Sequence, residues 1–124
     1  MQRSPFTHGA DAPAIEMHTL EGHPLAVPAK VRELLWGEKA VLVEMSAPAG
    51  FQAAPHAHDH ESFVYVVSGR IRATVGDTTR ELVPGDAVLH PLGVAHQIEA
   101  LLDTRWIELK APPHATWPTR KPDA

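Results

Sequence analysis

Histidine is the residue type in this sequence whose spacing most clearly indicates chemistry. The chain holds nine histidines against eleven lysines and arginines, and His56, His58 and His60 fall within five residues. In an extended segment, residues i and i+2 project from the same face, so His56 and His58 can present two imidazoles to one metal ion. Imidazole nitrogen is a common ligand for divalent transition metals.

A metal site needs a third ligand from elsewhere in the chain, because an isolated His-x-His pair is common on protein surfaces. His96 is a candidate, since it begins a predicted strand directly after the turn signal Pro91-Leu92-Gly93. Antiparallel strands in a barrel bring residues that are distant in sequence side by side, and can place His96 across from the pair. The hypothetical metal site therefore depends on an all-β fold.

The elements that must position these histidines are short strands between turn signals. Twelve prolines and eight glycines are spread along the chain, and no segment carries a long helical stripe of apolar residues. Ser68-Gly69 and Gly76-Asp77 predict hairpin turns, and Pro84-Gly85-Asp86 predicts a further turn. The predicted strands are Val31–Trp36, Ala40–Ala47, Phe63–Val67, Arg70–Val75, Thr79–Val83, Ala87–His90, His96–Leu101 and Arg105–Lys110. Strands of this length and spacing predict an antiparallel sandwich or barrel.

Length and composition predict one domain over residues 1–124, with a barrel core over about residues 30–112. The first dozen and the last eight or so residues are predicted to be poorly ordered unless something ties them down. The formal net charge is −4 and no basic stripe is present, so we expect no nucleic-acid partner. The absence of cysteine excludes a thiolate metal site and a cysteine nucleophile. No apolar run resembles a signal peptide or a membrane span, so we expect a cytoplasmic protein with no membrane partner.

Two gapped motifs resemble those of the cupin superfamily. The first places a glycine, a His-x-His pair and a second glycine in order, and its matches are Gly50, His56, His58 and Gly69. The second places a glycine, a Pro-x-Gly turn and a histidine, and its matches are Gly85, Pro91, Gly93 and His96. The resemblance implies a small antiparallel double-stranded β-helix, or jelly-roll barrel, whose divalent metal is held by His56, His58 and His96. It also implies structural glycines with positive φ, and a homodimer paired through N-terminal strands.

Ser62 departs from the first motif, which normally holds Glu, sometimes Gln, at this position. Serine is a poor ligand at neutral pH, so three neutral imidazoles would leave the ion its full +2 charge and make it a stronger Lewis acid. The fourth coordination place is then open to water or substrate, which we favour. Alternatively, Ser62 itself, His60 or Glu61 is the fourth ligand, or the site binds metal weakly or not at all. Ala100 also departs, because cupins often have Asn there.

The run from His56 to Ser62 is also similar to the HxHPHEQ run of small bacterial cupins of the pectin-degradation and quercetin-dioxygenase-like kinds. Some of the former open unsaturated uronate sugars, and the similarity extends to Ala111-Pro112-Pro113. That group's glutamine ligand is Ser62 here, and no arginine follows the Pro-Pro pair. The similarity therefore supports the shape of the subfamily more than its reaction.

Alternation along the predicted strands assigns further residues to one face or the other. Glu61 and Glu99 are the acids nearest the motif histidines, and either could act as a general base. We expect both to be solvated surface acids, with Glu99 on the outer face. Val64 and Val66 would form an apolar inner wall, and Tyr65 would point outward.

The aromatic and basic residues have two interpretations each. Trp36, Trp106 and Phe51 could line a substrate pocket, but ordinary core packing is the favoured interpretation. Arg70 and Arg72 could grip a carboxylate substrate, although basic residues are common on exposed strand faces.

Three hypotheses for function follow. We favour a metal-dependent enzyme acting on a small organic molecule, either a dioxygenase-like protein using iron or an isomerase or lyase using zinc, nickel or manganese. The second is a non-catalytic cupin that binds or senses a small molecule, because the usual carboxylate ligand is missing. The third is a structural metal, which ranks lowest because an open coordination place is typical of catalytic sites.

Overall fold

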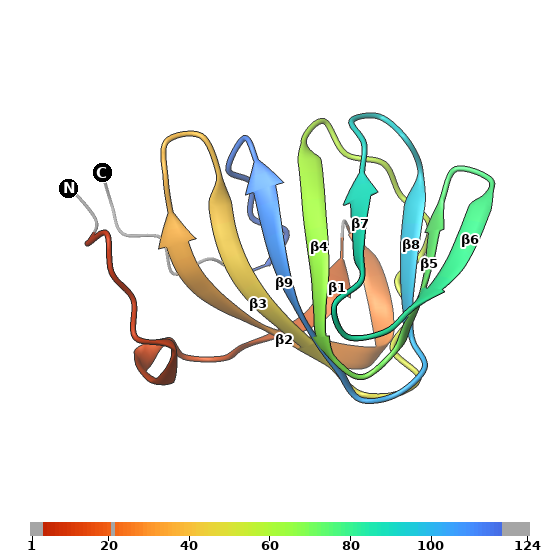
Figure 1. Ribbon diagram of the computed structural model, residues 1–124, viewed down its shortest axis with the longest axis horizontal. Helices are drawn as coiled ribbons and strands as arrows, with labels where there is room; N and C mark the ends of the chain where they lie inside the picture. The colour runs from red at the N-terminus through yellow and green to blue at the C-terminus, as the bar shows by residue number, and fades with distance from the viewer. Residues whose placement is uncertain (1–3, 21, 118–124) are drawn as a thin grey trace.

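The computed structural model describes residues 4–20 and 22–117 of the chain. Within them, a short 3-10 turn, η1 (Gly9–Asp11), precedes nine strands (Figure 1). The strands are β1 (Ile15–Leu20), β2 (His23–Trp36), β3 (Val41–Ala47), β4 (Glu61–Ser68), β5 (Ile71–Val75), β6 (Thr78–Leu82), β7 (Ala87–His90), β8 (His96–Ala100) and β9 (Thr104–Ala111). No helix in the described part of the chain is long and apolar enough to cross a membrane.

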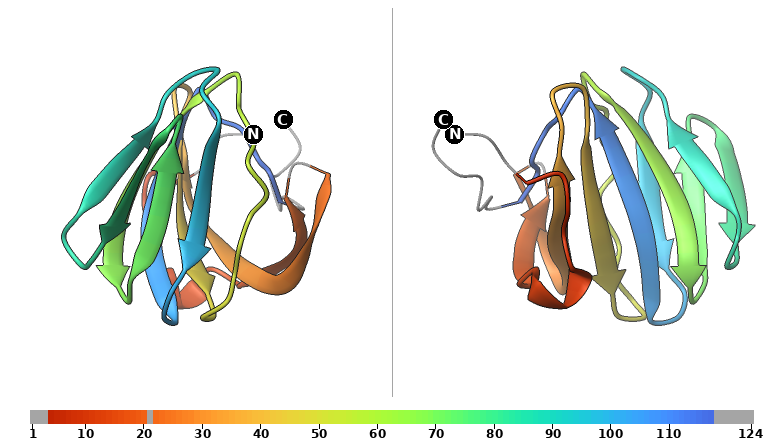
Figure 2. Two further views of the ribbon diagram at one scale, coloured as in Figure 1. Left: turned by 90° about the vertical axis from the view of Figure 1, so that its right-hand side faces the viewer. Right: turned by 60° about the vertical axis from the view of Figure 1, so that its left-hand side comes forward.

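The strands form two antiparallel sheets around a common interior (Figures 1 and 2). The larger sheet has the order β1-β2-β3-β9-β4-β7, and the smaller has the order β6-β5-β8. Strands that are distant in sequence, such as β3 and β9, are hydrogen-bonded neighbours. This arrangement confirms the predicted all-β jelly-roll barrel.

The alternation of side chains along β4 and β9 forms one wall of the interior. Ser62, Val64 and Val66 of β4 are at most 1% exposed, whereas the intervening Phe63 and Tyr65 are 44% and 51% exposed. Both the inner valines and the outward tyrosine agree with the period-two pattern of the sequence. On β9 the inward positions are paired with those of β4, and they include Trp106, Glu108 and Lys110.

The N-terminal part of the barrel begins earlier than the sequence predicts. β1 and the first half of β2 lie before residue 30, the predicted start of the barrel core. Pro24 and Pro28 made this segment look unlike a strand in the sequence. The structure accommodates both prolines because β2 pairs with β3 only from Lys30 onward. The first half of β2 therefore has a hydrogen-bonded neighbour on one side only, where proline is tolerated.

The turn at Ser68-Gly69 is not a hairpin, contrary to the sequence prediction. β4 belongs to the larger sheet and β5 to the smaller, so this turn carries the chain from one sheet to the other. Gly69 has φ +91, and a Cβ there would lie 2.4 Å from the carbonyl oxygen of Asp103. Its neighbour Arg70 donates its backbone N–H to Thr104 Oγ1 at 3.0 Å. Gly69 is therefore required by close packing against the start of β9 as well as by its backbone conformation.

The C-terminal tail is held further along than predicted. Trp117, the first residue of the tail predicted to be poorly ordered, is 5% exposed. Its ring lies against Trp36, with centroids 6.4 Å apart. Trp36 therefore packs against the tail, and the predictions for residues 1–3 and 118–124 lie outside the described residues.

Candidate metal centre

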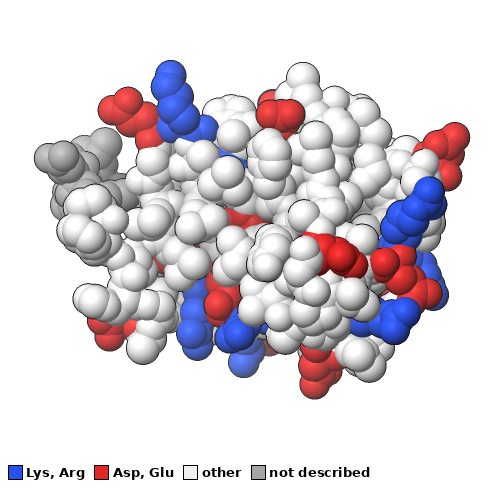
Figure 3. Space-filling model, in the orientation of Figure 1, with Lys and Arg blue, Asp and Glu red and all other residues white. Residues whose placement is uncertain are grey.

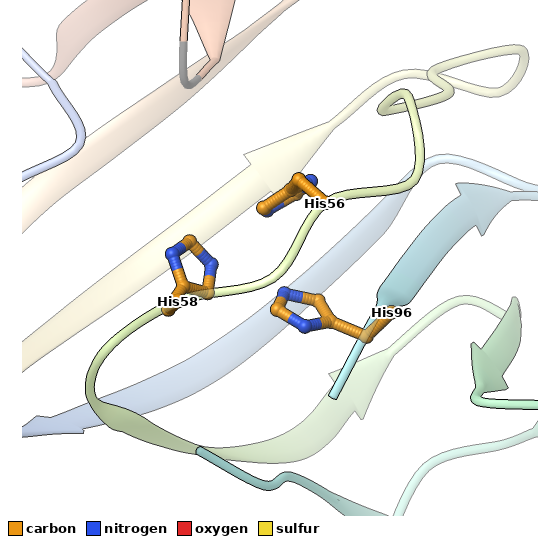
Figure 4. Close-up of side chains that lie close together, drawn as sticks. All are labelled: His56, His58 and His96. Atoms are coloured by element: carbon orange, nitrogen blue, oxygen red, sulfur yellow. The ribbon is translucent and has the colours of Figure 1, made fainter. Parts of the chain in front are cut away.

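Three histidines from two segments meet inside the barrel (Figure 4). His56 and His58 lie in the connection between β3 and β4, and His96 is the first residue of β8. His56 lies outside the regular strands and forms an isolated bridge with His96. The backbone N–H of His96 donates to the carbonyl of His56 at 2.8 Å, and the reverse bond is 3.1 Å. This bridge fixes the two segments side by side.

The three rings face a shared space. Their centroids are separated by 4.6 Å for His56 and His58, 4.5 Å for His56 and His96, and 4.7 Å for His58 and His96. One ring nitrogen from each lies within 4.8 Å of the others. The structure thus brings together the three residues predicted as ligands, in an arrangement that could hold one ion.

The hydrogen bonds and protonation of these rings suit metal binding. His56 Nδ1 lies 2.7 Å from the carbonyl oxygen of Ala54, so an Nδ1–H donor there leaves the Nε2 lone pair for a ligand. Burial, followed by the charge of Lys110, lowers the pKa of His58 to about 2. Burial also lowers the pKa of His96 to about 4. Both rings are neutral at neutral pH, as coordination requires, so the residues fit a divalent cation.

The histidines line a small cavity of about 40 Å³. Phe51 and Trp106 also line it, so these aromatics serve both the core and the pocket, while Trp36 is not among the lining residues. Leu20 of β1 and Thr116 of the C-terminal segment are also among the lining residues. A water molecule needs roughly 10–15 Å³ on this scale, so the cavity admits only a few non-hydrogen atoms in this conformation.

A family model described as a cupin domain matches residues 42–109. The chain belongs to the cupin family. An uncharacterised protein of Streptomyces coelicolor is 40% identical over 62 residues, which cover 49% of this cupin and 57% of that protein. This cupin thus matches only a little over half of that relative's length.

Solved structures share the fold. KdgF from Halomonas is 27% identical, with a TM-score of 0.67, over 69% of this chain and 82% of that one. An RmlC-like cupin from Shewanella frigidimarina is 22% identical, with a TM-score of 0.78, over 90% and 93%. A predicted oxalate decarboxylase from Thermotoga maritima is 15% identical, with a TM-score of 0.75, over 84% and 96%. The predicted membership of the cupin superfamily is confirmed.

Ser62, which departs from the first motif, lies inside the barrel. It is fully buried, and its Oγ has no hydrogen-bond partner among the described residues. It pairs with His90 of β7 on one side and with Lys110 of β9 on the other. The space that a Glu or Gln side chain would enter is therefore bordered by two larger polar side chains, neither of which is an acid.

The other candidate fourth ligands differ in position. His60 is 1% exposed, and its ring centroid lies 4.2 Å from that of His58. One of its ring nitrogens nevertheless lies within 4.8 Å of possible ligand atoms of Asp59 and His114, and His60 is not part of the three-histidine group. Glu61 is exposed at the start of β4.

His90 is a cavity residue that sequence reasoning missed. It is 3% exposed, its ring stacks on His96 at 3.8 Å, and neither ring nitrogen has a hydrogen-bond partner in the described part of the chain. Burial lowers its pKa to about 3. The sequence did offer one signal for His90. It lies two residues after Val88 in a predicted strand, immediately before the Pro-x-Gly turn, so the two side chains share a face.

A buried ion pair also faces this cavity. Lys110 Nζ lies 2.8 Å from Glu108 Oε2, and Trp106 Nε1 donates to Glu108 Oε1 at 2.9 Å. Burial alone would raise the pKa of the Glu108 carboxyl, but the Lys110 charge and these hydrogen bonds outweigh it and lower the pKa to about 2. Alternation with Trp106 along β9 could have placed both charges inward.

The remaining sequence candidates lie outside the cavity. Glu99 pairs with Arg72 at 3.0 Å, and Arg70 pairs with Glu81 at 2.7 Å. Basic and acidic side chains lie side by side at the right edge of Figure 3, where Figure 1 shows β5 and β6. The interpretation of these arginines and of Glu99 as solvated surface residues agrees with the structure.

Proposed function

We propose that this cupin binds a divalent metal ion through His56, His58 and His96 and uses it on a small organic molecule. The observation that carries the proposal is the convergence of one nitrogen from each ring, within 4.8 Å, into a cavity. A bound ion would supply Lewis-acid or redox chemistry at its open coordination place. Iron, zinc, nickel and manganese all accept imidazole ligands, so these three residues do not select one metal among the four.

The residues around the site position and select the substrate. The ammonium group of Lys110 lines the cavity while paired with Glu108, and it could also donate a hydrogen bond to a substrate oxygen. Phe51 and Trp106 exclude water from the same space. Because the cavity measures about 40 Å³, only the reacting end of a substrate enters, unless Leu20 or Thr116 moves aside.

A second candidate function is a non-catalytic cupin that binds or senses a small molecule. Glu108 favours it, because both carboxylate oxygens are engaged and the low pKa makes this group a weak general base. No other acid is among the residues that line the cavity.

Metal content tests the first part of the proposal. The untagged protein is purified without chelator or nickel resin, reconstituted with each of the four metals, and analysed by elemental analysis. We expect His96→Ala to lose one equivalent of metal relative to the parent, whereas His23→Ala, a change on the exposed surface, keeps it. Equal metal content in the parent and His96→Ala contradicts the site.

Turnover separates the two functions. The metal-loaded protein is incubated with a panel of small hydroxy, keto and carboxylic acids, including unsaturated uronates because of the resemblance around His56–Ser62, and followed by proton NMR. Consumption of a compound that requires metal and is lost in His96→Ala supports an enzyme. Binding of a compound without its consumption supports the sensor.

We also propose that two copies pair through the N-terminal strands. In the described part of the chain β1 is an edge of the larger sheet, hydrogen-bonded to β2 on one side only, and such edges favour pairing. Sedimentation velocity at micromolar concentration should then give twice the 13.5 kDa chain mass, and a monomer contradicts this.

A further inference from the structure

A second group of possible ligands lies beside the three-histidine site. One donor atom each from Asp59, His60 and His114 lies within 4.8 Å of the others. The rings of His60 and His114 stack with centroids 4.5 Å apart, and His60 Nδ1 is 3.9 Å from Asp59 Oδ1. His60 and Asp59 precede β4, and His114 follows β9, so the neighbouring strands β4 and β9 bring the group together.

His60 provides the observation that points to a ligand. It is 1% exposed, and neither of its ring nitrogens has a hydrogen-bond partner among the described residues. A buried polar group without a partner destabilises the folded state, and buried polar atoms of native proteins are almost always paired. A bound ion at this point would reduce that cost, because it would give one of the two imidazole nitrogens a partner.

The chemistry of the group differs from that of the three-histidine site. Two imidazoles and one carboxylate form a mixed nitrogen and oxygen set that divalent transition metals accept. Asp59 adds a negative charge that the first site lacks, and its side chain is 97% exposed. An ion here would therefore be reachable from solvent, with coordination places left for water or substrate.

We propose that Asp59, His60 and His114 form a second divalent-cation site. It goes beyond the proposed function, and it does not require the first site to bind metal. The ring centroids of His58 and His60 are only 4.2 Å apart, so the two sites are adjacent.

Zinc binding to four variants tests the proposal, with stoichiometry and affinity measured by calorimetry and elemental analysis. We expect two equivalents in the parent and in the surface control His23→Ala. His114→Ala and Asp59→Asn should each weaken one equivalent at least tenfold and leave the other unchanged. His96→Ala should weaken only the other equivalent. Asp59→Asn is the variant that should fold like the parent, because that side chain is almost fully exposed. A loss of zinc in this variant therefore reports on the site rather than on misfolding.

Each outcome decides between the two sites. A single equivalent that His96→Ala removes and Asp59→Asn leaves intact overturns the second site while the proposed function stands. A single equivalent that Asp59→Asn and His114→Ala weaken, but His96→Ala does not, supports the second site and contradicts the first. No zinc binding by the parent overturns both.

Discussion

Glu108 and Lys110 offer a test of how the interior tolerates charge. They are 7% and 4% exposed, and their charged atoms are 2.8 Å apart. Glu108→Gln keeps the size of the side chain and an oxygen for Trp106 Nε1, but removes the negative charge. Lys110 is then left as a buried cation without its ionic partner, and we expect the folded state to be strongly destabilised.

The size of the effect follows from the burial of the pair. Breaking a buried ion pair by removing one partner costs about 3–5 kcal/mol. An unfolding entropy of about 2.1 cal/mol/K per residue gives roughly 0.26 kcal/mol/K for 124 residues. Glu108→Gln should therefore lower Tm by roughly 12–19 °C.

A double-mutant cycle of Glu108→Gln and Lys110→Met measures this directly. Thermal and urea unfolding are recorded with chelator present, so that metal binding does not contribute to stability. Because the double variant leaves no unpaired charge, we expect it to be more stable than Glu108→Gln alone by at least about 2 kcal/mol. Single effects that add to within about 0.5 kcal/mol would refute the coupling.

Three further predictions concern packing, pH and the metal. Gly69→Ala should destabilise the protein by at least about 2 kcal/mol more than Gly85→Ala in urea unfolding, because both glycines have positive φ but only Gly69 has backbone atoms at 2.4–2.7 Å from an added Cβ. Burial lowers the folded pKa of His90 to about 3 from 6.5, so the unfolded chain binds more protons between these values. The metal-free protein should thus lose stability as pH falls from about 6.5, by up to about 1.4 kcal/mol per pH unit for this histidine, and unchanged urea midpoints at pH 7 and pH 5 would contradict this. Ser62→Glu should tighten zinc binding at the three-histidine site at least tenfold by adding an anionic ligand, and an unchanged Kd in calorimetric titration would show that the fourth place lies elsewhere.

The sequence was sufficient for the features that depend on local spacing. The His-x-His pair, the Pro-x-Gly turn before His96 and the glycines of both motifs all have fixed intervals, and Gly50, Gly69, Gly85 and Gly93 have positive φ. Period-two alternation also placed Val64 inward and Tyr65 outward. These features need no knowledge of which strands are neighbours.

Features that depend on strand order were not predictable in this way. The turn at Gly69 looks like a hairpin locally, but its role is decided by the packing of Thr104, which is distant in sequence. His114 carries no motif, and strand alternation indicates only which face His90 occupies. The two histidines come close to the site because β7 and β9 flank β4. Without the order of strands in the sheet, a solvated histidine looks the same in sequence as one whose side chain lies beside the metal-ligand candidates of a neighbouring strand.

The charges inside the barrel bear on what the three-histidine site would bind. Glu108 and Lys110 cancel each other, and His58, His90 and His96 are neutral at neutral pH because burial lowers the pKa of each. Ser62 contributes no charge, so a divalent ion would keep its +2 charge in a poorly solvated space. The group that completes the coordination is then favoured if it is an anion, such as hydroxide or a substrate carboxylate or enolate. Under the proposed function, the absence of a carboxylate at Ser62 would favour anionic substrates. Ser62→Glu should then weaken the binding of such substrates even where it strengthens the binding of the metal.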